Sequence, residues 1–158
     1  MGTMTVDIRE VNDEAARFQI SNDILRSLPQ WFGIEDSLVE YCTQSQHLPF
    51  YAAYQGDKAV GFLSLLAHNS ATTEVFVMGV LEPYHRRGIG RALIDRAADV
   101  AASAGARMLT VKTLADTHPD KNYARTRDFY TSVGFIPLEV FPELWGADNP
   151  CLFLAKPL

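Results

Sequence analysis

The sequence predicts an α+β fold, in which strands follow one another as a meander and helices pack on the faces of the sheet. Short segments with alternating apolar residues recur along the chain, and segments with apolar residues at helical spacing stand between some of them. At 158 residues, the chain is long enough for a substantial core. We therefore expect a single domain over residues 1–158.

The N-terminal half is expected to contribute four strands and two helices. Apolar alternation marks the strands, and the capping pair Asn12–Asp13 marks the start of the first helix. A turn at 55–58 contains Gly56 and joins two strands as a hairpin. In order, the expected elements are a strand at 5–9, a helix at 14–20, a helical segment around 38–41, and strands at 50–54, 59–67 and 74–81.

The C-terminal half is expected to contribute two helices and three strands. The first helix places Leu93, Ile94 and Ala97 on one face and ends at Gly105, and the second is closed by Gly134. In order, the expected elements are a helix at 91–104, a strand at 108–114, a helix at 123–133, and strands at 135–141 and 151–155.

A basic turn with two glycines connects the strand at 74–81 to the helix at 91–104. Gly88 and Gly90 let the backbone approach a ligand closely and take unusual dihedral angles. Amides at the start of the helix point at such a ligand along the positive end of the helix dipole. Arg86, Arg87 and Arg91 add charge-assisted donors. The turn therefore predicts a site for a pyrophosphate.

Spacing separates three kinds of phosphate site. A P-loop needs two glycines with four residues between them, followed by Lys and Ser or Thr. Gly88 and Gly90 have one residue between them and are followed by Arg91 and Ala92. A dinucleotide fingerprint needs a third glycine where Leu93 stands, and an acidic residue about twenty positions further on, where the chain offers a strand with Lys112. Both alternatives fail. A plain strand-to-helix connection with solvated arginines stays open.

The turn resembles the acetyl-coenzyme A loop of the GNAT superfamily of N-acetyltransferases, whose motif is Gln/Arg-x-x-Gly-x-Gly/Ala directly after a strand. The motif reads His85-Arg86-Arg87-Gly88-Ile89-Gly90 here, with His85 where Gln or Arg is usual. A second segment, Phe129-Tyr130-Thr131-Ser132-Val133-Gly134-Phe135, is similar to the aromatic-Tyr-x-x-x-Gly-Phe segment of the family. The resemblance covers nearly the whole chain. The helix departs from the family at Tyr123, where Asn is frequent; Asn122 is one residue out of register.

The resemblance implies a mixed, mostly antiparallel central sheet of about six to seven strands in an α/β/α arrangement. This sheet is splayed between the strand ending at Leu81 and the strand starting at Met108. It also implies acetyl-coenzyme A as cosubstrate. Backbone of the strand pairs with the pantetheine arm and polarises the thioester carbonyl, and Gly79 is consistent with a bulge there. The implied cofactor-binding residues are Met78, Gly79, Val80, Arg86, Arg87, Gly88, Ile89, Gly90, Arg91 and Ala92.

Acetyl transfer to an amine needs a base, because an amine is mostly protonated at neutral pH. It also needs an acid that protonates the leaving thiolate. The resemblance assigns the acid to Tyr130; packing of the last helix is the alternative. Glu74 is the candidate base, since a Glu lies at the same offset in the histone-acetylating branch, fourteen residues before the first loop glycine. We expect it to share one side of its strand with Phe76, Met78 and Val80. Two alternatives stay open for Glu74. It is a solvated Glu at the edge of the strand, or it is a charge that attracts the amine while ordered water acts as the base.

The acceptor wall of the family corresponds to a segment that contains Trp31 and Phe32 here. These aromatic residues are candidates for substrate binding, with helix-anchoring core as the alternative. The loop at 116–121 could also border the site, with solvated loop as the alternative, and no role is assigned to His118.

Composition excludes several classes of protein. With 14 basic and 19 acidic side chains the net charge is −5, which disfavours nucleic acid and suits a cationic amine. No apolar run approaches the ~20 residues that span a bilayer, and residues 1–10 lack a secretory signal, so we expect a cytoplasmic protein. Four histidines without ligand spacing, and the distant Cys42 and Cys151, predict no metal site.

These observations predict an acetyl-coenzyme A-dependent N-acetyltransferase that acts on a primary amine, in a ternary complex, by direct attack. A small-molecule acceptor is favoured because the sequence offers no tail or extra domain for protein recognition. Acetylation of a protein N-terminus or lysine, and a non-catalytic coenzyme A-binding sensor, are the alternatives. A homodimer is one option for the assembly.

Overall fold

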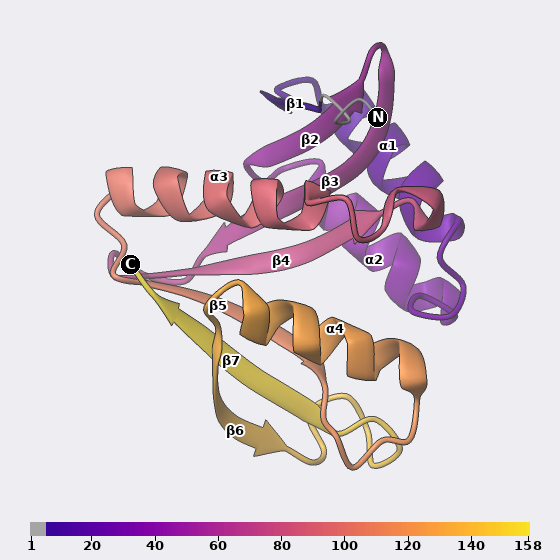
Figure 1. Cartoon of the computed structure of the whole chain (residues 1–158), viewed down its shortest axis with the longest axis vertical. Coiled ribbons are helices and arrows are strands. Elements are labelled where there is room, and N and C mark those ends of the chain that lie inside the picture. The colour runs from indigo at the N-terminus through magenta and orange to yellow at the C-terminus, as the bar shows by residue number, and fades with distance from the viewer. Residues whose placement is uncertain (1–5) are drawn as a thin grey trace. The chain divides into compact units, whose positions relative to one another are not determined.

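The structure, a computed structural model, describes residues 6–158, and contacts within the chain divide it into two compact units. The N-terminal unit comprises the residues up to Leu66 together with Val75–Val100. The C-terminal unit comprises Ala67–Glu74 and Ala101–Leu158. Figure 1 shows the course of the chain through both units. A single domain over 1–158 stays a prediction.

The described residues contain seven strands, four α-helices and one short 3-10 helix. Their hydrogen-bonded order is β1-β2-β3-β4-β5-β7-β6, with β4 and β5 parallel and the pairs β1–β2, β2–β3, β5–β7 and β6–β7 antiparallel. This confirms the mixed, mostly antiparallel sheet. The elements are β1 (Asp7–Glu10), α1 (Glu14–Arg26), α2 (Glu35–Ser45), β2 (Phe50–Gln55), β3 (Lys58–Ala67), β4 (Thr72–Val80), η1 (Glu82–Tyr84), α3 (Ile89–Ser103), β5 (Met108–Leu114), α4 (Lys121–Ser132), β6 (Ile136–Phe141) and β7 (Cys151–Pro157).

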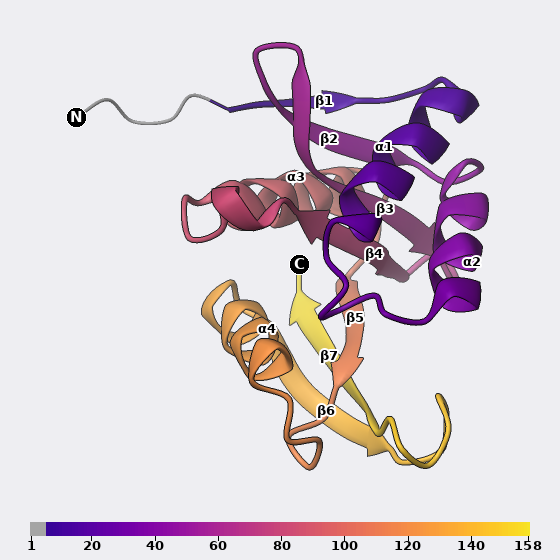
Figure 2. The same cartoon turned by 90° about the vertical axis from the view of Figure 1, so that its right-hand side faces the viewer.

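The N-terminal unit packs α1 and α2 on one face of strands β2 to β4 and α3 on the other (Figure 2). Asp13 caps α1, as expected, by accepting a hydrogen bond from the Ala16 amide at 2.8 Å. The helix continues to Arg26, six residues beyond the expected end, because Ile24 and Leu25 extend its buried face. Of the first expected strand, Thr5 lies outside the described residues.

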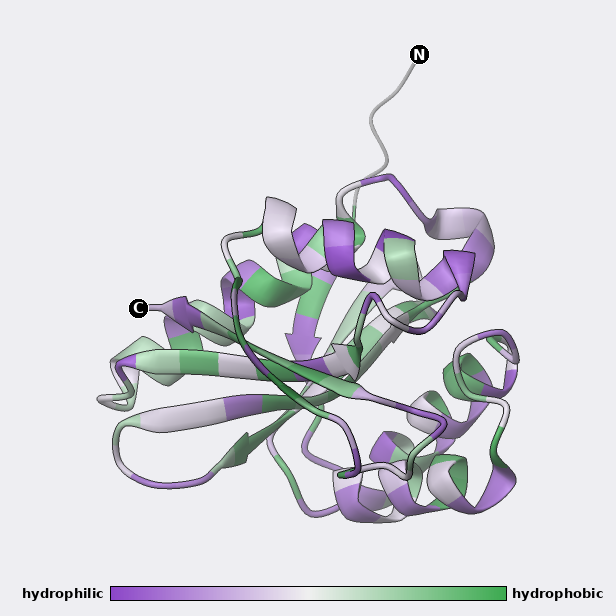
Figure 3. Ribbon diagram, turned by 90° about the horizontal axis from the view of Figure 1, so that it is seen from below, coloured by the Kyte–Doolittle hydropathy of each residue, from purple (hydrophilic) through white to green (hydrophobic). Residues whose placement is uncertain are grey.

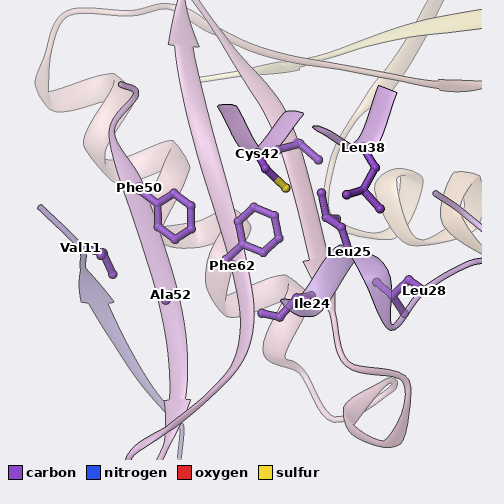
Figure 4. Close-up of a cluster of buried hydrophobic side chains, with 10 residues drawn as sticks. Val11, Ile24, Leu25, Leu28, Leu38, Cys42, Phe50, Ala52 and Phe62 are labelled. Atoms are coloured by element: carbon purple, nitrogen blue, oxygen red, sulfur yellow. The ribbon is translucent and has the colours of Figure 1, made fainter. Parts of the chain in front are cut away.

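The core on the α1–α2 side is a cluster of buried apolar side chains in which Phe50 and Phe62 stack with ring centroids 5.2 Å apart (Figure 4). Figure 3 shows that hydrophobic and hydrophilic residues are interleaved along the helices. The members of the cluster are Val11, Ile24, Leu25, Leu28, Leu38, Cys42, Phe50, Ala52, Phe62 and Val77.

Phe76 and Val80 of strand β4 pack toward different helices. The Phe76 ring meets the edge of the Tyr41 ring on α2 at a centroid distance of 5.5 Å. Val80 faces α3 instead, because its Cγ2 atom lies beside Gly61 together with Ile89 and Leu93. The expectation that Glu74, Phe76, Met78 and Val80 share one side of the strand is therefore wrong for Val80, because Phe76 packs toward α2 and Val80 toward α3.

Gly79 is explained by the packing of α1 on β4. A Cβ atom at this position would lie 3.1 Å from Ile24 Cγ2, and 3.3 Å from both Leu25 and Leu28 side chains. These distances are tighter than ordinary van der Waals contact, so a Cβ atom here would require the α1 side chains to move by a few tenths of an ångström. The predicted bulge at Gly79 stays a prediction.

The C-terminal unit contains the ladder β5–β7–β6, helix α4, and the first residues of β4. Strand β4 pairs with β5 through Thr72–Glu74 and Met108–Thr110. The splay of the two strands stays a prediction. Helix α4 begins two residues before its expected start, because Asp120 accepts hydrogen bonds from the Asn122 and Tyr123 amides. Within residues 6–158, no helix has the length and apolar character to span a membrane.

Candidate functional site

The turn between β4 and α3 has an unusual backbone. Gly88 has a φ of 82°, and Arg86 has a φ of 62°, which no other non-glycine residue in the described part of the chain shares. A left-handed conformation disfavours residues with a Cβ atom and is typical of functional turns. A Cβ atom added at Gly88 would meet nothing within 4 Å, so the dihedral angle, not crowding, favours glycine there.

Helix α3 starts differently from α1 and α4, which both begin after a capping aspartate. Its first turn contains no acidic residue, and Ala92 makes the first helical hydrogen bond, from its amide to the Gly88 carbonyl at 3.0 Å. The amides of Ile89 and Gly90 therefore precede the helical ladder. Arg86, Arg87 and Arg91 are exposed around this helix start. The arrangement can attract and hold an anion.

His85 closes the turn. Its Nε2 lies 2.6 Å from the carbonyl oxygen of Val80, and a carbonyl only accepts, so Nε2 carries the hydrogen. The same ring meets the edge of Trp31 at a centroid distance of 5.6 Å. The residue that departs from the family motif thus ties the loop to the end of β4, and nothing in the sequence indicated this bond.

Glu74 is buried, with 5 % of its surface exposed. Its Oε1 lies 2.7 Å from His68 Nε2, and Lys112 Nζ lies 3.3 Å from Oε1 and 3.1 Å from Oε2. The alternative of a solvated strand-edge Glu is therefore wrong. Sequence reasoning missed both partners, because His68 lies in the β3–β4 connection and Lys112 lies 38 residues away on β5. The parallel register that pairs Glu74 with Thr110 brings Lys112 within reach, two residues further along the same face.

Tyr130 lies near the end of α4 and is 6 % exposed. Its ring packs against Phe129 and Phe135, with centroid distances of 5.4 Å and 5.5 Å. These contacts bear out the packing role that was its alternative, and they leave the acid role a prediction. Like Glu74, Tyr130 belongs to the C-terminal unit, whereas the turn belongs to the N-terminal unit.

Trp31 and Phe32 follow α1 and are half-buried against the α1–α2 cluster. Both amides donate to the Leu28 carbonyl, and the Phe32 ring meets the edge of Tyr41 at 6.0 Å. Trp31 and Phe32 therefore pack as part of the core, which was the alternative to substrate binding. Their contact with an acceptor stays a prediction.

Both cysteines are free and buried. Burial raises the pKa of Cys42. Burial also raises the pKa of Cys151, to about 11; the charge of Lys112 lowers this pKa and the charge of Glu74 raises it. Among residues 6–158, no group of three or more His, Cys, Asp or Glu side chains could hold a metal ion.

Comparison with known proteins agrees with this architecture. The model of the acetyltransferase (GNAT) family matches residues 11–135. An uncharacterized N-acetyltransferase of Halalkalibacterium halodurans is 31% identical over 127 residues, which cover 74% of this chain and 65% of that relative. The chain thus spans slightly less than two thirds of the relative's length.

Solved structures share the fold. A GNAT-family protein from Desulfovibrio desulfuricans superposes with a TM-score of 0.80 at 18% identity, covering 97% of this chain and 99% of the other. An aminoglycoside 6'-N-acetyltransferase complexed with coenzyme A superposes with a TM-score of 0.72 at 20% identity, covering 98% and 97%. Because the family model spans most of the chain and these folds agree with it, the chain belongs to the acetyltransferase (GNAT) family.

Proposed function

We propose that this chain transfers the acetyl group of acetyl-coenzyme A to a primary amine of a small molecule, by direct attack in a ternary complex. The observation that carries the proposal is the turn between β4 and α3, with its positive φ angles and an arginine-bearing helix start whose first turn contains no acidic residue. The coenzyme A in the aminoglycoside acetyltransferase neighbour supports the choice of cosubstrate.

The turn would hold the pyrophosphate of the cosubstrate. The amides of Ile89 and Gly90 would donate to its oxygens, with the positive end of the α3 dipole behind them. Arg86, Arg87 and Arg91 would supply charge from solvent-exposed positions, where salt screens their effect. The backbone of Met78 and Val80 would pair with the pantetheine arm, although the Val80 carbonyl already accepts one bond, from His85.

The reaction forms one bond between the amine nitrogen and the acetyl carbon and breaks the bond between that carbon and sulfur. The amine must first lose a proton on the Glu74 side, because the protonated form has no electron pair for attack. A β4 amide near Met78 or Gly79 would stabilise the oxyanion. The Tyr130 hydroxyl would then give its proton to the leaving thiolate, and the second proton that the nitrogen loses on becoming an amide would restore the hydroxyl.

Acceptor identity is tested by measuring release of coenzyme A thiol with a panel of small amines, amino acids, aminoglycosides and peptides. We expect turnover with one class of small amine. Preference for peptides would overturn the small-molecule assignment, and binding of acetyl-coenzyme A without turnover of any acceptor would indicate a sensor. The protein's own thiols should contribute little background, because both are buried and their pKa values are raised.

A further inference from the structure

The Glu74 carboxylate is already engaged on both oxygens. Lys112 Nζ lies within 3.3 Å of each oxygen, and the Glu74 side chain is 6 % exposed. Lys112 is itself only 30 % exposed, so both oxygens are occupied by a partner inside the protein. Glu74 is therefore better suited to hold a neighbouring group than to take the proton itself.

His68 is the neighbour that Glu74 holds. A carboxylate accepts and does not donate, so the 2.7 Å contact assigns the ring hydrogen to Nε2 and makes Nδ1 the proton-accepting nitrogen of the neutral ring. The His68 side chain is 42 % exposed, whereas Glu74 is buried. Solvent and ligands therefore reach the His68 ring more readily than the Glu74 carboxylate behind it.

The connection that bears His68 is held by its own hydrogen bonds. The His68 amide donates to the Thr72 carbonyl at 3.0 Å. Asn69 Oδ1 accepts from the amides of Ala71 and Thr72 at 2.8 Å and 2.9 Å. These bonds fix the backbone on both sides of the ring, which reduces the reorganisation needed during proton transfer.

We propose that His68 is the group that accepts the proton of the acceptor amine, and that Glu74 is a positioning residue which acts through it. This inference rests on the proposed function. The N–H bond of the ammonium breaks, an Nδ1–H bond forms, and the electron pair stays on the amine nitrogen for attack. Glu74 fixes the ring tautomer and stabilises the imidazolium, as the aspartate does in serine hydrolase triads.

The charges around His68 fit this role. Glu74 on β4 and Lys112 on β5 cancel, so a neutral His68 completes a cluster without net charge. Cys151 on β7 is electrostatically coupled to both of these residues and stays a neutral thiol near neutral pH, because its pKa is about 11. The exposed ring can then return its proton to solvent after each turnover.

The test compares two glutamine substitutions. His68→Gln keeps an N–H that can donate to Glu74 but cannot take a proton. His47→Gln is the matched control, because His47 also contacts a glutamate, Glu14, at 3.3 Å, but in an exposed pair in which both side chains are 64 % exposed. At neutral pH, we expect His68→Gln to lower kcat about 100-fold or more with little change in acetyl-coenzyme A binding, and His47→Gln to match the wild type.

The pH profile separates proton transfer from structure. The deficit of His68→Gln should shrink as the pH approaches the pKa of the amine, because free amine no longer needs a base. Added imidazole should restore part of the turnover of His68→Ala. Equal wild-type and His68→Gln rates at every pH would overturn the assignment while leaving acetyl transfer intact. Absence of turnover in the wild type with every acceptor would overturn both proposals.

Discussion

The turn between β4 and α3 and the cluster around Glu74 are built in opposite ways. The turn is contiguous in sequence, uses backbone amides and unusual dihedral angles, and exposes its charges to solvent. The cluster brings together His68, Glu74 and Lys112 from a loop and two strands, and it buries its central charge. The first arrangement suits binding of a polyanion, and the second suits control of a single proton. Substitutions in the two regions should therefore change different measured quantities.

The largest effect is expected at Tyr130, the other side chain to which chemistry is assigned. Tyr130→Phe keeps the ring that packs on Phe129 and Phe135 but removes the hydroxyl. Turnover should fall by roughly 10- to 1000-fold, with little change in acetyl-coenzyme A affinity. Steady-state kinetics with the true acceptor and calorimetry with acetyl-coenzyme A measure these quantities. Tyr54→Phe, in the N-terminal unit, is the control. Equal turnover of wild type and Tyr130→Phe at all pH values would leave the ring a packing role only.

Binding should respond most strongly at the turn. Gly88→Glu places a bulky carboxylate where the phosphates are expected, and should weaken acetyl-coenzyme A binding by more than ~2 kcal/mol in calorimetry. Gly90→Glu should act in the same direction, whereas Arg87→Ala should be milder because its charge is screened.

Gly105→Glu is the matched control for this change. Gly105 has a φ of 94° and, like Gly88, open space where a Cβ atom would lie, but it follows the other end of α3. Both variants therefore introduce the same kind of backbone strain and the same charge. A similar loss of affinity in the two would show that strain, and not obstruction of the phosphates, weakens binding.

The two regions also differ in how far the sequence predicted them. The turn was predictable because glycines, arginines and a helix start follow one another within a few residues, and a local pattern determines the backbone. The sequence placed Lys112 on a strand but did not predict its contact with Glu74, because this contact depends on the parallel β4–β5 register. The positions of the strands along the chain followed from apolar alternation, whereas a simple meander was wrong for their order in the sheet, because β7 lies between β5 and β6 and β4 is parallel to β5. Tertiary contacts thus decided what local patterns could not.

A buried ion pair should be more sensitive than an exposed one. Lys112→Met leaves the buried Glu74 carboxylate without its counter-ion, so the free energy of unfolding should fall by about 1–3 kcal/mol in urea denaturation. Arg26→Met removes the cation of the pair with Glu35, in which the side chains are 45 % and 63 % exposed, and should change stability by less than about 1 kcal/mol. Adding Glu74→Gln to Lys112→Met should restore part of the loss. Equal losses in the two single variants would contradict the comparison.

The smallest effect is expected in alkali, at the cysteine next to the Glu74 cluster. Burial raises the pKa of Cys151 from its usual value of 9.0 to about 11, so the folded state keeps this proton over a range in which the unfolded chain has lost it. The resulting stabilisation of the thiol form is complete below the unfolded pKa and is lost as the pH rises from 9.0 toward about 11. At about pH 10 the loss from this group alone should be about 1.4 kcal/mol. Cys151→Ala lacks the group, so its unfolding free energy should decline less steeply over this range than that of the wild type, whatever the packing cost of the substitution. Urea denaturation at several pH values measures the two slopes, and equal slopes would show that the Cys151 thiol titrates alike in the folded and unfolded states.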